Sequence, residues 1–199
     1  MKDHHIVYVP GLGDPRYGTQ GWILKLWRLL GVRAHYCPMR WGDKEPFAPK
    51  FEKLLGIIDE LIAQNHEVSL IGISAGASAV LNAFAARKDR INGVVCVCGK
   101  INHPETVRPE RYKANPAFKD SLEQLQKSLG RLGPAERSRI MSIHPIDDAT
   151  VPPADTIIEG AIEKTVASKG HVTTIATQIT FGAAGIVRFL ASQANQPKH

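Results

Sequence analysis

The sequence has few of the residues and patterns that mark special classes of protein. Its 199 residues include only three cysteines, Cys37, Cys96 and Cys98, an odd number without the spacing of a metal site. All three lie in apolar, strand-like segments, so we expect reduced, buried thiols in a cytoplasmic protein. Aromatic residues make up 7% of the chain and do not alternate with a basic run, which argues against binding to nucleic acid.

Long apolar runs are also absent. No segment approaches the ~20 residues that a helix needs to cross a bilayer, and residues 1–5 lack the apolar region of a signal peptide. The formal net charge of +6 is scattered along the chain rather than focused. We therefore expect a soluble chain of one domain, residues 1–199, with neither a membrane nor a nucleic acid as its partner.

What the sequence does contain is an alternation of short apolar segments with segments of helical periodicity. This alternation predicts an α/β fold, a three-layer sandwich in which about six mostly parallel strands are covered by helices on both faces. In such a sheet, sites form where loops leave the carboxyl ends of the strands. Strands are expected at 5–9, 32–37, 68–73, 91–98, 140–145 and 165–168, and helices at 21–30, 51–63, after Ser74, and at 118–129, 153–162 and 180–193.

The most informative stretch follows the third expected strand. Gly72, Ser74 and Gly76 stand in the order G-x-S-x-G, between a strand of branched residues and a helix that begins with small residues. A serine at such a sharp turn is forced into an unfavourable backbone conformation, and a side chain two residues before or after it would collide with the neighbouring chain. The alternative is that Ser74 is an ordinary turn serine without a catalytic role. The pattern resembles the nucleophile elbow of α/β-hydrolases.

The resemblance extends to the residues that a nucleophilic serine needs, since in that family a carboxylate and then a histidine follow the serine along the chain. His171, just past the last expected strand, is the expected base, and His103 is the reserve candidate. Asp147 and Asp148 both leave the fifth expected strand. The family's aspartate is commonly followed by two variable residues and Val-Pro, a register that favours Asp148, with Asp147 as the alternative.

The loop after the first expected strand completes the resemblance. Its residues Pro10 to Gly13 are similar to the family's His-Gly-x-Gly loop, with proline in place of the usual histidine. The resemblance implies that the backbone amides of Leu12 and Ala75 form the oxyanion hole. A nucleotide-binding reading of the same glycines fails, because the third glycine of that fingerprint would fall at Arg16.

The resemblance implies a serine hydrolase that cleaves a small-molecule carboxylic ester without a cofactor or a metal. The short segment between the fourth and fifth expected strands leaves little room for a lid. The alternative is a catalytically silent hydrolase scaffold that acts as a binding protein, because a fold alone does not establish an activity. The sequence does not reveal the natural substrate or the oligomeric state. Candidate substrate contacts in the surrounding loops are Asp14, Arg16, Tyr17, Trp41, Lys100 and His103.

Overall fold

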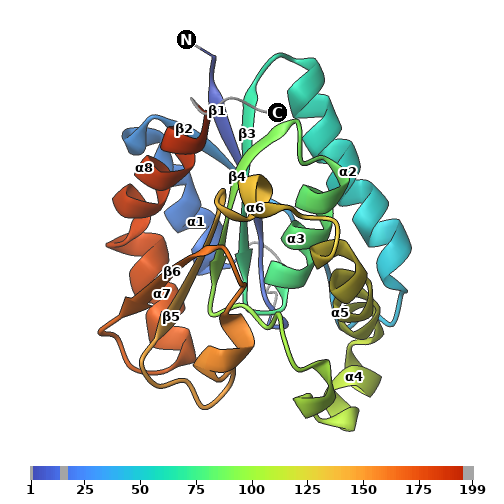
Figure 1. Cartoon of the computed structure of the whole chain (residues 1–199). Coiled ribbons are helices and arrows are strands. Elements are labelled where there is room, and N and C mark those ends of the chain that lie inside the picture. Colours follow the sequence, from blue (N-terminus) through green and yellow to red (C-terminus); the bar gives the residue numbers. More distant parts are fainter. Residues whose placement is uncertain (1, 14–17, 195–199) are drawn as a thin grey trace.

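A single parallel sheet of six strands forms the centre of the fold. The computed structural model describes residues 2–13 and 18–194, and within them the strand order is β2-β1-β3-β4-β5-β6. Because every described strand pair is parallel, the carboxyl ends of all six strands lie at one edge, the lower edge in Figure 1. The strands are β1 (His4–Val9), β2 (Val32–Tyr36), β3 (Glu67–Ile73), β4 (Ile91–Val97), β5 (Ile140–Pro145) and β6 (Ile162–Val166).

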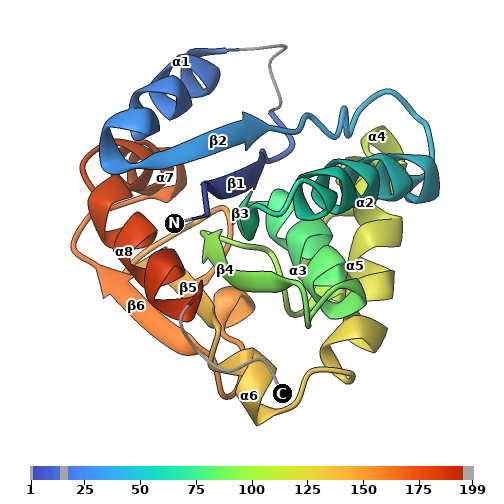
Figure 2. The same ribbon diagram turned by 90° about the horizontal axis from the view of Figure 1, so that it is seen from above.

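Helices cover both faces of this sheet, as Figure 2 shows from above. One face carries α1 (Thr19–Leu26), α7 (His171–Thr180) and α8 (Ala183–Ala194), and the other carries α2 (Phe47–Ala63), α3 (Gly76–Ala86) and α5 (Pro116–Leu129). Alternate residues of β1 enter separate cores, Ile6 and Tyr8 on the α8 side and Val7 and Val9 on the α3 side. Burial on both faces explains why the central strands read as nearly continuous apolar runs.

Buried polar contacts join α5 to α3. The Ser78 and Ser121 hydroxyl oxygens lie 2.7 Å apart, and the Asn82 amide donates to the Ser121 carbonyl at 2.9 Å. The Ser128 hydroxyl donates to the side-chain oxygen of Asn82 at 2.7 Å. Because buried polar groups need partners, this network fixes how α5 lies against the helix that follows Ser74.

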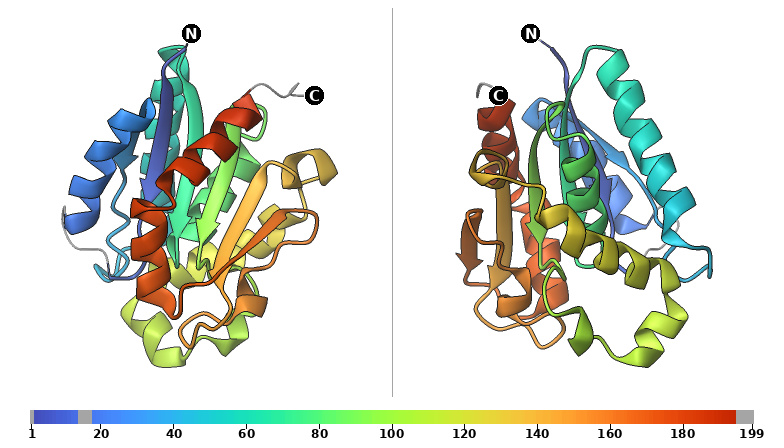
Figure 3. Two further views of the ribbon diagram at one scale, coloured as in Figure 1. Left: turned by 90° about the vertical axis from the view of Figure 1, so that its left-hand side faces the viewer. Right: turned by 45° about the vertical axis from the view of Figure 1, so that its right-hand side comes forward.

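Short helical segments lie among the connections between the strands. Figure 3 shows α4 and η3 below the carboxyl ends of the strands, where connections from distant parts of the chain meet. The segments are η1 (Trp27–Leu30), η2 (Pro104–Thr106), α4 (Pro109–Ala114), α6 (Pro134–Arg137) and η3 (Pro153–Thr156).

Two expectations for the carboxyl-terminal third of the chain are wrong. The helix expected at 153–162 is only the 3-10 turn η3, and the sixth strand begins at Ile162 instead of residue 165. Gly160, with a φ of +81°, reverses the chain before β6. The helix expected at 180–193 is confirmed as α8, but a further helix, α7, precedes it from His171 and meets it at 68°. The β-branched residues of α7 concealed it, because they have low helix propensity.

Other expectations are confirmed. Cys37, Cys96 and Cys98 are all free and buried. In the described ranges, no single helix has the length and apolar content to cross a bilayer; the bent pair α7 and α8 passes that test only when the two are taken together.

Candidate active site

Ser74 occupies the turn between β3 and α3, in the geometry expected from its two glycines. Its φ is +52°, in the left-handed region. A Cβ on Gly72 would lie 2.5 Å from Val80 Cγ2 and 2.6 Å from Ala77 Cα, and a Cβ on Gly76 would overlap the carbonyl oxygen of Val9. The collisions expected on both sides of the serine are therefore confirmed, and α3 packs against the sheet only because these positions lack a side chain.

The loop after β1 lies directly beside Ser74. A Cβ on Gly11 would come within 3.0 Å of the Ser74 Cβ. Ala75 immediately precedes α3, so its amide belongs to the positive end of that helix. Among the described residues, no backbone acceptor is found for the amides of Leu12 and Ala75. Both residues line a cavity together with Ser74.

Asp148 and His171 are joined by a hydrogen bond. His171 Nδ1 lies 2.7 Å from Asp148 Oδ2, and since a carboxylate only accepts, Nδ1 is the donor and Nε2 is left with its lone pair. The other carboxylate oxygen accepts from the amides of Thr150 at 2.8 Å and Val151 at 3.0 Å. The Asp148 side chain is fully buried, whereas Asp147 is exposed and only its carbonyl takes part, accepting from the amide of Gly170.

Cys98 lies beside this pair, and its thiol donates to the His171 carbonyl at a sulfur–oxygen distance of 3.9 Å. Cys98, Asp148 and His171 bring their ligand atoms within 4.8 Å of one another, close enough to consider a metal ion. However, burial, reinforced by the Asp148 carboxylate, raises the pKa of Cys98 to about 12. The protonated thiol agrees with the hydrogen bond that Cys98 donates to the His171 carbonyl.

Two cavities flank Ser74 and have different walls. The first, of about 430 Å³, has a mixed wall of apolar and polar residues, and its charged residues are Lys100, Arg108, Arg111 and Asp155. The second, of about 340 Å³, also contains His171 and has an apolar wall. No hydrogen bond joins Ser74 to His171 among the described residues, although both line this second cavity. Its apolar wall consists of Ile23, Ile73, Val172, Ile175, Ala176 and Ile179.

The cationic side chains around the first cavity differ in whether another residue of the protein neutralises them. Lys100 Nζ is buried and lies 2.5 Å from Asp155 Oδ2 and 2.7 Å from Thr106 Oγ1, so its charge is neutralised within the protein. Arg108 and Arg111 are exposed, and no acidic partner for their guanidinium groups is found in the described part of the chain. The sequence does not single out either arginine, because nothing in this polar segment distinguishes them from its other basic residues. Only the position of α4 and of Arg108 before it shows that both line the cavity.

Of the other candidates from the sequence, Trp41 and His103 do not line these cavities. Trp41 is a core residue with 1% exposure, whose indole donates to the Pro10 carbonyl at 3.1 Å, so it supports the loop after β1 from below. His103 is exposed and lies 3.2 Å from Glu105, and it is not on either cavity wall. Asp14, Arg16 and Tyr17 lie outside the described residues.

Comparison with known proteins gives the fold. No protein-family description and no curated protein matches the sequence. Among solved structures, Est1E from Butyrivibrio proteoclasticus is 13% identical, with a TM-score of 0.72 over 98% of this chain and 90% of that one. The monoacylglycerol lipase of Paleococcus ferrophilus is 15% identical, with a TM-score of 0.61 over 95% and 94%. The pyrethroid hydrolase PytH is 12% identical, with a TM-score of 0.67 over 98% and 99%. The chain therefore has the α/β-hydrolase fold, as expected.

The close packing around Ser74 makes a testable prediction for stability. Gly76→Ala places a methyl group against the Val9 and Pro10 carbonyls, so the free energy of unfolding should fall by about 3 kcal/mol or more. Gly56→Ala is the matched control, because Gly56 is an exposed glycine inside α2 with open space at its Cβ position. This variant should gain about 0.5–1 kcal/mol. Chemical denaturation of both variants measures the difference, and equal stabilities would contradict the packing argument.

Proposed function

We propose that this chain is a serine hydrolase that cleaves carboxylic esters, with Ser74, Asp148 and His171 as its catalytic triad. The observation that carries the proposal is the His171–Asp148 hydrogen bond, at the wall of a cavity that also contains the Ser74 side chain. A serine hydroxyl is a poor nucleophile unless a base takes its proton, and a bonded carboxylate fixes that base in the tautomer that can do so. The structural neighbours named as a monoacylglycerol lipase and a pyrethroid hydrolase agree with this chemistry.

The proposed reaction has two halves. Ser74 Oγ attacks the ester carbonyl while His171 Nε2 takes the hydroxyl proton, and the amides of Leu12 and Ala75 stabilise the oxyanion. His171 then gives the proton to the departing alcohol, which leaves an acyl group on Ser74 Oγ. A water molecule attacks this acyl-enzyme with His171 again as base, and collapse releases the carboxylic acid and restores the serine. Asp148 stabilises the histidine cation in both halves.

The contact between Ser74 and the Asp148–His171 pair bears on the alternative, a catalytically silent scaffold. The hydrogen bonds of residues 2–13 and 18–194 do not include one between Ser74 and His171. Such bonds are often long in a free enzyme and tighten when substrate binds, so this geometry is compatible with turnover. A scaffold that binds without catalysis remains the second candidate, and turnover assays separate the two.

We also propose that the substrate combines an apolar part with an anionic part. The wall formed by α1 and α7 suits an apolar group of the ester, whereas Arg108 at the first cavity and Arg111, which lines both cavities, present two exposed cations. A guanidinium pairs well with a carboxylate or a phosphate, because its donors match two oxygens at once. Lys100 contributes little, since Asp155 already neutralises it.

A fluorophosphonate probe tests Ser74 as the nucleophile. The unmodified protein should be labelled, and Ser74→Ala should lose the label together with at least about 10⁴-fold in kcat. Ser138→Ala, a change at an exposed serine remote from both cavities, should leave labelling intact. Intact-mass measurement of the three proteins would read the result, and labelling of Ser74→Ala to the same extent would remove the mechanism. Labelling without turnover on any ester would favour the silent scaffold.

The adjacent aspartates allow a matched test of the triad acid. Asp148→Asn should lower kcat by about 10³-fold or more, because the amide no longer holds His171 in the required tautomer. Asp147→Asn should stay within about 2-fold of the unmodified enzyme, since only the main chain of Asp147 takes part in a hydrogen bond. Steady-state kinetics on one ester suffices for the comparison. The reverse order of effects would assign the acid to Asp147.

Substrate charge gives a test of the cationic cavity. Arg111→Leu should lower kcat/KM for a carboxylate-bearing ester by about 10-fold, because an exposed charge-assisted hydrogen bond is lost. For the methyl ester of the same compound, the change should be within about 2-fold. Arg131→Leu removes an exposed arginine outside both cavities and should alter neither rate. An equal loss on both esters would rule out charge recognition while leaving the hydrolase assignment intact.

A further inference from the structure

A group of histidines lies at the opposite end of the sheet from Ser74. His5 is on β1, His35 is on β2, and His66 immediately precedes β3, so adjacent strands bring all three together. The His5 ring is stacked on His66 with centroids 4.0 Å apart, and on His35 with centroids 4.9 Å apart. Along β1, His5 is about 20 Å from the loop beside Ser74, at about 3.3 Å per residue. The cluster is therefore separate from the proposed active site.

One nitrogen of this cluster is buried without a partner. His5 is 4% exposed, and its Nε2 has no hydrogen bond in the described structure, whereas its Nδ1 lies 3.0 Å from His35 Nε2. A buried polar atom without a partner is costly, and in native proteins an ion or a water often satisfies such an atom.

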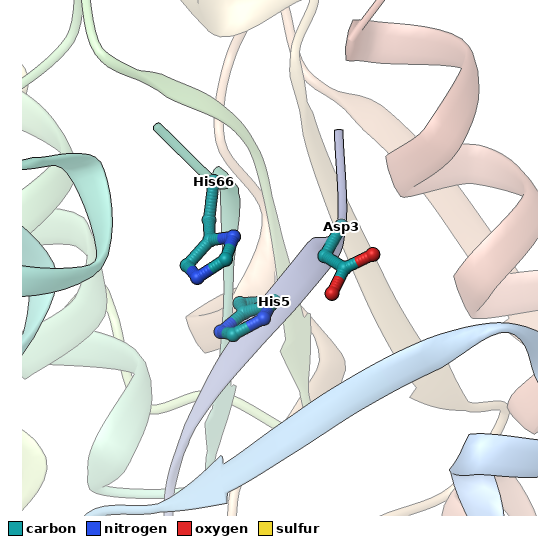
Figure 4. A group of neighbouring side chains, drawn as sticks. All are labelled: Asp3, His5 and His66. Carbon is teal, nitrogen blue, oxygen red and sulfur yellow. The ribbon is translucent and has the colours of Figure 1, made fainter. Parts of the chain in front are cut away.

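The carboxylate of Asp3 and the ring of His66 lie close to His5. Asp3, His5 and His66 each offer one ligand atom, and these atoms lie within 4.8 Å of one another. Figure 4 shows the rings of His66 and His5 beside each other, with the side chain of Asp3, the residue before β1, next to them. We propose that Asp3, His5 and His66 bind a divalent transition-metal ion of the zinc class at the amino ends of β1 and β3. Two imidazoles and a carboxylate suit such an ion, whereas calcium and magnesium prefer oxygen ligands alone.

The hydrogen bond from His5 to His35 fits this assignment. A histidine that binds a metal through Nε2 must carry its proton on Nδ1, and here Nδ1 faces His35 Nε2 as an acceptor. His35 is therefore a positioning residue, which fixes the tautomer and the orientation of the His5 ring. Its own ring needs no direct contact with the ion.

Coordination of an ion requires movement of these side chains, since the His5 and His66 rings are stacked at an interplanar angle of 15°. Nitrogen ligands of a tetrahedral zinc ion lie about 3.4 Å apart, so the stacked rings have to tilt toward a common point. His66 is in the short connection between α2 and β3, and Asp3 is half exposed. Asp3 pairs with Arg33 at 3.3 Å, but both side chains of this ion pair are exposed, so the pair is weak and exchanges readily for a metal ligand.

Zinc titration of the chelator-treated full chain tests the proposal. Calorimetry should detect one tight equivalent per chain, and the melting temperature should rise with zinc concentration, because the ion binds only the folded arrangement. His66→Phe keeps a ring to stack on His5 but removes a donor, so the affinity should fall by about 100-fold or more. His103→Phe makes the same change at an exposed histidine elsewhere and should bind zinc like the unmodified chain.

A second variant keeps the test valid if His66→Phe folds poorly. Asp3→Asn changes one exposed side chain and should weaken zinc binding by about 10-fold. Absence of tight binding to the unmodified chain would overturn the proposal, as would unchanged affinity in both variants. Loss of binding in Asp148→Asn, with full binding in His66→Phe, would place the ion beside Cys98 instead and would also overturn it.

Discussion

The rest of the site depends on the close contact of α3 with β1 and β3 at Ser74. Gly76 lies so near the carbonyls of Val9 and Pro10 that no side chain fits between helix and strand. A non-glycine residue at positive φ costs about 1–3 kcal/mol, so the surrounding contacts must hold Ser74 in place. They do so through its main chain, since its amide donates to the Val97 carbonyl and its carbonyl accepts from Ala77 and Lys100. The hydroxyl is consequently the one part of Ser74 left free to react.

The proposed acid and base form a second unit that is assembled independently of the serine. The side chains of Asp148 and His171 are hydrogen-bonded, and the main chains of the same two loops meet where Gly170 donates to Asp147 at 3.1 Å. This double connection fixes the imidazole relative to β5 and β6, whereas Ser74 is fixed relative to β3 and β4. The second cavity lies between Ser74 and the Asp148–His171 pair. A relative shift of the two therefore alters the distance from the Ser74 hydroxyl to the His171 imidazole without breaking a hydrogen bond inside either unit.

The sequence predicts features that depend on local chemistry and misses those that depend on which segments meet. The six strands and the strained turn at Ser74 follow from apolar runs and glycine spacing. The fold was predicted well for that reason. The 153–162 segment was misread as a helix, because its apolar spacing carried no information on the turn at Gly160. Trp41 looked like an exposed loop aromatic, but tertiary packing places its indole beneath the Pro10 carbonyl. Arg108 and Arg111 are candidates for substrate binding only because the α4 region lies beside the loop that contains Leu12.

The two ends of the sheet satisfy their buried polar groups in different ways. At the carboxyl ends, the buried charges of Lys100 and Asp155 face each other, and the buried carboxylate of Asp148 accepts from the imidazole and two amides. Such compensation keeps charged groups stable in a dry environment and leaves the free cations at the rim of the cavity. At the amino ends, His5 Nε2 has no hydrogen-bond partner among the described residues, although His5 Nδ1 pairs with His35, and an unpaired buried polar atom costs free energy. An apolar residue would pack there without that cost, so the imidazole is better explained by a ligand than by packing.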